Sequence, residues 1–96
     1  MFLEPAETEL TGSWVTLSGA VVSDSVCKRI EWLIKYALEQ IAVNPESGGW
    51  EILFRDKRDG RYWERTYPHG ESHGGGPPRL SVLAFEDARK KYGVGN

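Results

Sequence analysis

A glutamate and two histidines lie close together in the segment from His69 to His73. Glu71 and His73 form a Glu-x-His pair, which could supply two metal ligands or an acid–base couple. A closed metal site needs three or four ligands, and the single cysteine, Cys27, is distant in the chain. The pattern therefore favours a structural role, with His73 bonded to loop backbone and Glu71 paired with an arginine. A small metal-dependent or acid–base enzyme that uses Glu71 and His73 is the alternative.

Three glycines, Gly74 to Gly76, follow this pair and could suggest a phosphate-binding loop. Such a loop opens onto a helix N-terminus and usually carries a lysine. Here Pro77, Pro78 and a predicted strand follow instead, so the match fails. The run more plainly indicates a backbone that passes close to another element, because glycine carries no Cβ.

Arginines alternate with aromatic residues between Arg55 and Tyr67, a composition that nucleic-acid-binding surfaces share. Acidic residues are interspersed among them, and the net charge of the 96-residue chain is −2. Cross-strand ion pairs explain this pattern more economically than contacts to phosphates. We therefore expect no nucleic-acid partner.

Length and composition predict one domain, residues 1–96, of ordinary globular character. A lone cysteine cannot form an intrachain disulfide, and inside a predicted helix Cys27 is expected to act as a small buried apolar residue. We recognise no signal peptide and no apolar run that reaches the roughly 18 residues of a membrane span. The expected location is the cytoplasm, with no membrane partner.

The charges are unevenly distributed along the chain. Before Cys27 all charged side chains are acidic, and every lysine and arginine comes later. An N-terminal acidic patch could receive a basic partner. The alternative is that these are solvated surface carboxylates. The acidic side chains are Glu4, Glu7, Glu9 and Asp24.

The elements that must position these groups can be read from periodicity and turn residues. Apolar residues recur at helical spacing over about 24–42, and Ser23 is a suitable N-cap. Two hairpins are predicted, at 12–22 with a Ser18-Gly19 turn and at 50–67 with Asp59-Gly60 at the corner. A short strand at 80–84 and a helix at 86–92 follow, while 1–11 is expected to be irregular.

These elements predict an α+β fold, with an antiparallel sheet of about five strands that the long helix covers on one face and a short C-terminal helix. Trp14, Trp50 and Tyr62 are large enough to dominate a small core. Asp56 is expected to bond to the backbone of its hairpin turn. Positive φ angles are expected at three glycines, namely Gly12, Gly60 and Gly75.

The combined pattern resembles the immunity protein 27 family of bacterial polymorphic-toxin systems. The segments that carry the resemblance cover nearly the whole chain, and Arg65 is the one departure. They are Glu7–Trp14, Cys27–Leu33, Gly48–Glu51, Arg55-Asp56, Asp59–Glu64, Thr66–Pro68 and His73–Leu80.

The resemblance implies a protein that binds the C-terminal domain of a cognate secreted toxin and neutralises it, in competition between bacteria. It implies no enzymatic activity, no catalytic residue, no metal and no cofactor. We expect a monomer or weak dimer that presents a rigid surface with aromatic, arginine and charged groups. The candidate toxin-binding residues are Glu7, Glu9, Glu51, Arg61, Trp63, Glu64, Glu71 and His73.

Overall fold

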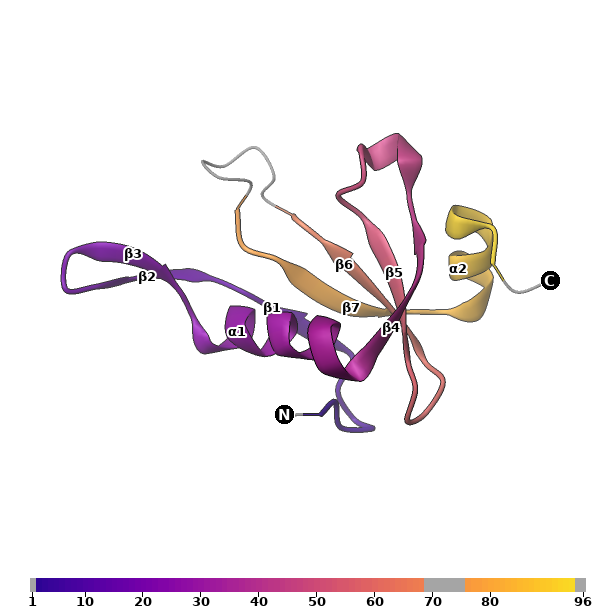
Figure 1. Cartoon of the computed structure of the whole chain (residues 1–96), viewed down its shortest axis with the longest axis horizontal. Coiled ribbons are helices and arrows are strands. Elements are labelled where there is room, and N and C mark those ends of the chain that lie inside the picture. Colours follow the sequence, from indigo (N-terminus) through magenta and orange to yellow (C-terminus); the bar gives the residue numbers. More distant parts are fainter. Residues whose placement is uncertain (1, 69–75, 95–96) are drawn as a thin grey trace.

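A five-stranded antiparallel sheet forms the centre of the molecule (Figure 1). The computed structural model describes residues 2–68 and 76–94. The α+β class and the five-stranded sheet confirm the sequence prediction. In spatial order the strands are β1 (Glu9–Thr11), β7 (Arg79–Leu83), β6 (Tyr62–Thr66), β5 (Ile52–Asp56) and β4 (Leu38–Val43).

The first hairpin lies outside this sheet. Strands β2 (Trp14–Leu17) and β3 (Ala20–Ser23) pair only with each other and project from the body at the left of Figure 1. Ser18 and Gly19 have φ angles of 52° and 80°, as a primed two-residue turn requires. The hairpin itself is confirmed, but its place in the sheet is taken by β1, from the segment predicted to be irregular, and by β4.

The long helix is shorter than predicted. Helix α1 (Ser25–Trp32) is capped by Asp24, one residue after the predicted cap, and the Asp24 carboxylate accepts from the Cys27 N–H at 2.8 Å. It continues as the π-helical turn η1 (Leu33–Ala37) and then gives way to β4. The predicted helical end at 42 is wrong, because Leu38–Val43 form β4, whose pairing with β5 shifts register between Gln40 and Ala42. That irregularity breaks the alternation of the strand, so its apolar residues also match a helical period.

Helices cover both faces of the sheet. Ile30 and Leu33, from α1 and η1, pack in one buried cluster with Phe54, Trp63 and Leu80 of the sheet. The opposite face carries buried Leu53 and is covered in part by α2 (Phe85–Tyr92), whose Ala88 is also buried. The C-terminal helix and its Gly93 cap, at φ 71°, are confirmed.

The second hairpin has the turn chemistry that the sequence predicts. The Asp56 carboxylate accepts from the Arg58 N–H at 2.9 Å, and Gly60 has a φ of 79°. Gly12 serves a different purpose from the one predicted, because its φ is not positive. A Cβ at Gly12 would lie 2.5 Å from the Cys27 Sγ and 2.8 Å from the Pro78 carbonyl oxygen. Gly75 lies outside the described residues.

Candidate interaction surfaces

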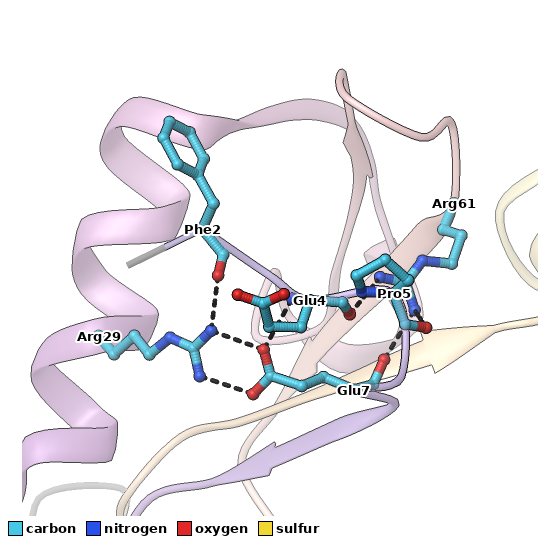
Figure 2. Close-up of polar contacts among 6 residues, drawn as sticks. All are labelled: Phe2, Glu4, Pro5, Glu7, Arg29 and Arg61. Carbon is cyan, nitrogen blue, oxygen red and sulfur yellow. Dashed lines mark hydrogen bonds and ion pairs between the residues drawn. The ribbon is translucent and has the colours of Figure 1, made fainter.

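Arg29 ties the N-terminal segment to α1 (Figure 2). Its two terminal nitrogens each donate to the Glu7 carboxylate at 2.7 Å, and Nη2 also donates to the Phe2 carbonyl at 2.8 Å. The hydrogen bonds from Arg29 lower the pKa of Glu7 to about 2. Glu7 is therefore ionised at neutral pH and already bound within the protein.

Arg61 holds the same segment from the sheet side (Figure 2). Its guanidinium donates to the carbonyl oxygens of Glu4 at 3.0 Å and Glu7 at 2.7 Å, while its Nε donates to Asp59 at 2.7 Å. Backbone acceptors without a strand partner need such donors when they are shielded from water. Glu4, Glu7, Arg29 and Arg61 together form what we call the N-terminal network.

Two further acidic candidates have partners of their own. Glu9 is exposed and pairs with Arg79, which lowers its pKa. Glu51 accepts from the Asn44 side chain at 3.0 Å and lies 3.1 Å from the Lys91 Nζ. Glu51 thus links the loop that contains the short 3₁₀ helix η2 (Pro45–Ser47) to α2.

The expectation that Trp63 and Glu64 lie on an exposed face is wrong. The exposed fractions of these residues are 0% and 7%. They belong to β6, which has strand neighbours on both sides, and the helices cover the two faces to which these residues point. Glu64 accepts from the Tyr92 hydroxyl at 2.7 Å and lies 2.6 Å from the Lys91 Nζ. Burial, followed by the nearby Glu64 carboxylate, raises the pKa of Tyr92.

The tryptophans predicted for the core are instead largely at the surface. Trp14 is 39% exposed and Trp50 is 49% exposed, while Tyr62 is half-buried. Side-chain alternation assigns residues to a face of a strand, but it does not show how far along the strand a helix reaches. Trp50 lies between the short 3₁₀ helix η2 and the start of β5. Cys27, in contrast, is buried as predicted, and burial raises the pKa of its thiol.

Glu71 and His73 lie outside the described residues, so their proposed roles stay predictions. Across residues 2–68 and 76–94, no group of three His, Cys, Asp or Glu side chains is arranged to hold a metal ion. In the same part of the chain, no helix is both long enough and apolar enough to cross a bilayer.

Two exposed tryptophans, Trp14 and Trp50, gather with the half-buried Arg65 and Tyr67 at one end of the sheet. Three hollows meet at Tyr67, with volumes of about 650, 350 and 230 Å³. Trp50 lines the two larger hollows, and Trp14 lines the smallest. Arg65 lines the two smaller ones. We call Trp14, Trp50, Arg65 and Tyr67 the aromatic–arginine surface.

The candidate residues of the sequence analysis did not include this surface. A detectable signal was present, since Arg65 departs from the family resemblance and Trp50 follows two glycines. Gly48 and Gly49, directly before Trp50, have φ angles of 72° and 90°, which glycine adopts without the steric cost that other residues incur. What could not be read from the sequence was how closely α1 packs against each part of the sheet.

The fold and its surfaces define a small α+β protein whose acidic candidates within the described residues are bound to internal partners. Comparison with known families gives a match to Immunity protein 27 over residues 16–84. The chain belongs to this family, which is a family of immunity proteins, as the sequence pattern indicated. No curated protein and no solved structure matches the chain.

Proposed function

We propose that this protein binds a cognate secreted bacterial toxin domain and neutralises it by protein–protein inhibition in the cytoplasm. The observation that carries the proposal is membership of the Immunity protein 27 family over residues 16–84. That stretch includes α1 and strands β4 to β7, the frame on which both surfaces described above depend. Neutralisation would protect the producing cell and its kin during competition between bacteria.

The contacts within the molecule support a preformed binding surface. The N-terminal network and the Glu51–Lys91–Glu64 ion pairs tie both chain ends to the sheet. A surface that is ordered before binding loses less conformational entropy on association, so more of its contact energy appears as affinity. Exposed tryptophan and arginine are the residue types that most often anchor protein interfaces.

The proposal treats the protein as a non-enzyme that needs no cofactor and acts as a monomer or weak dimer. The enzyme alternative depends on Glu71 and His73. A His73→Ala variant that folds and still protects a host cell would exclude it. Loss of protection, together with loss of a measurable turnover, would favour it.

Co-expression tests the proposal directly. The toxin domain encoded beside this gene is produced in a bacterial host with and without the protein, and growth and co-purification are measured. We expect restored growth and a complex that survives size-exclusion chromatography. Growth arrest in the presence of well-folded protein, with no complex recovered, would contradict the proposed function.

A further inference from the structure

Arg65 differs from the other arginines of the sheet in having no carboxylate partner among the described residues, whereas Arg55 pairs with Glu39 and Arg79 with Glu9. Its Nη2 lies 3.5 Å from the Trp50 carbonyl oxygen, at the long limit of a hydrogen bond, and its Nε is buried without an acceptor. Across residues 2–68 and 76–94, no carboxylate lies within ion-pair distance of its guanidinium. A guanidinium can donate five hydrogen bonds, and with the Nε buried it is the two terminal nitrogens of Arg65 that can serve a partner.

Aromatic rings hold this arginine in place. The Arg65 guanidinium carbon lies 5.0 Å from the centre of the Tyr67 ring, and Tyr67 makes an edge contact with Trp50 at 5.3 Å. A hollow of about 350 Å³ is lined by these three side chains together with Gly48 and Gly49. The arrangement joins a cation without a carboxylate partner to apolar rings in a concave surface, which is the composition of an interface hot spot.

The loop that carries Trp50 is ordered by its own hydrogen bonds. The Ser47 hydroxyl donates to the Asn44 carbonyl at 2.7 Å and accepts from the Glu51 N–H at 3.0 Å. The Asn44 side chain donates to Glu51 at 3.0 Å, and the Asn44 N–H donates to the Glu51 carbonyl at 2.9 Å. Trp50 is therefore presented by a closed loop, so binding at its ring requires little reordering.

We propose that the aromatic–arginine surface is the docking site for an acidic segment of the toxin domain. A carboxylate of that segment pairs with Arg65, and neighbouring apolar side chains cover Trp50 and Tyr67. The inference rests on the proposed immunity function and names the chemistry of the partner that this function requires. Charge complementarity selects the occupant, because a carboxylate can bind the arginine fork through two parallel hydrogen bonds.

Glu31 supplies an internal test of the charge argument. It is exposed and lines the 230 Å³ hollow together with Arg65, yet it lies beyond ion-pair distance of the guanidinium. An acidic segment that enters this region is repelled by Glu31 and attracted by Arg65. Reversing the two charges one at a time should therefore change affinity in opposite directions.

The experiment measures binding of the toxin domain encoded beside the gene, purified from the co-expressed complex, to the full chain and four variants. Arg65→Glu and Trp50→Ala should each weaken binding by roughly 30-fold or more. Arg65→Lys should lose part of the affinity, because it keeps the charge without the fork. Glu31→Lys should strengthen binding at low salt. Far-UV circular dichroism and urea unfolding check that each variant is folded.

The outcomes separate this inference from the proposed function. If the unmodified chain binds the toxin domain and folded Arg65→Glu and Trp50→Ala bind equally well, the docking site is wrong while the immunity function stands. If the unmodified chain does not bind, the immunity function fails and the inference fails with it. Binding of a single-stranded oligonucleotide, or concentration-dependent dimerisation, that Arg65→Glu abolishes would assign the surface to a nucleic acid or to a second copy instead.

Discussion

At each end of β6 an arginine lies beside the aromatic residue two positions later in the chain, but the two pairs serve opposite purposes. At one end the Arg61 guanidinium lies 5.0 Å from the centre of the Trp63 ring, and at the other Arg65 lies 5.0 Å from the centre of the Tyr67 ring. Arg61 is bound to two close backbone carbonyls and a carboxylate, whereas Arg65 has one long contact. Residue type and spacing are alike, so the remaining hydrogen-bonding capacity decides which end can serve a partner.

The same contrast applies to the acidic candidates. Glu7 is held by two hydrogen bonds from Arg29, and Glu64 is buried beneath α2. Acidic side chains bound in this way already have partners, and a recognition contact through them would first have to break those pairs at a cost in free energy. The comparison therefore shifts the expected docking region from the acidic N-terminal segment to the end of the sheet at Trp50.

The largest expected effect is on stability, where the buried Trp63 should differ from the exposed Trp50. Trp63→Ala removes a fully buried ring beneath α1 and should lower the free energy of unfolding by about 3–5 kcal/mol. Trp50→Ala should lower it by less than about 1 kcal/mol, because nearly half of that side chain is exposed. Urea unfolding followed by far-UV circular dichroism measures both. Equal losses of unfolding free energy in the two variants would contradict the assignment of Trp63 to the core and of Trp50 to the surface.

The next effect concerns the two arginines. Arg61→Ala removes the hydrogen bonds to Glu4 and Glu7 that attach the N-terminal segment, so it should lower the free energy of unfolding by about 2 kcal/mol. Arg65→Ala should lower it by less than about 1 kcal/mol. Arg55→Ala is a matched control, because its ion pair with Glu39 is exposed and should contribute about 0–1 kcal/mol. A greater loss from Arg65→Ala than from Arg61→Ala would refute the assignment of roles.

These contrasts show which parts of the structure were accessible from the sequence. The β5–β6 hairpin was predicted because Asp56, Asp59 and Gly60 specify its turn by local chemistry. The end of α1 was not, since the β4–β5 register shift lets the residues of β4 match two periods. Local signals determine turns and caps, whereas the choice of neighbouring strands depends on contacts between distant segments.

The candidate site was less accessible for a related reason. The sequence shows that aromatic and charged residues alternate along β6, and the alternation correctly places Arg61, Trp63 and Arg65 on one face. It does not show that Trp63 is fully buried beneath α1 while Arg65 faces a hollow that α1 lines. How closely a helix packs against each part of a sheet is a tertiary property, and it separates core residues from surface residues here.

Acidification should weaken the N-terminal network. The ordinary pKa of Glu7 is 4.5, and in the folded protein it falls to about 2. Because the folded-state pKa is the lower one, the stabilisation is fully present above about pH 4.5 and is lost as the pH falls toward 2.

The measurement compares the unmodified chain with Glu7→Gln. The unmodified chain should be more stable by about 1–2 kcal/mol at pH 7, less than the full pKa shift implies because a quarter of the Glu7 side chain is exposed. The difference should shrink between pH 4.5 and pH 2. Glu39→Gln, in an exposed ion pair, should show little difference at any pH. A constant difference for Glu7→Gln would show that its charge is not the source.

The smallest effect should give the sign of the partner's charge. Glu9 is exposed at the edge of the sheet, and its partner Arg79 lines the 650 Å³ hollow. Steering by acidic residues toward a basic toxin surface predicts that Glu9→Lys slows association. Docking of an acidic segment predicts the opposite, because the substitution adds positive charge beside the aromatic–arginine surface.

We expect Glu9→Lys to associate with the toxin domain about two- to threefold faster at low salt, with the difference abolished at high salt. Stopped-flow fluorescence of the exposed tryptophans can follow the reaction, and slower association of folded Glu9→Lys would restore the acidic segment as the docking element.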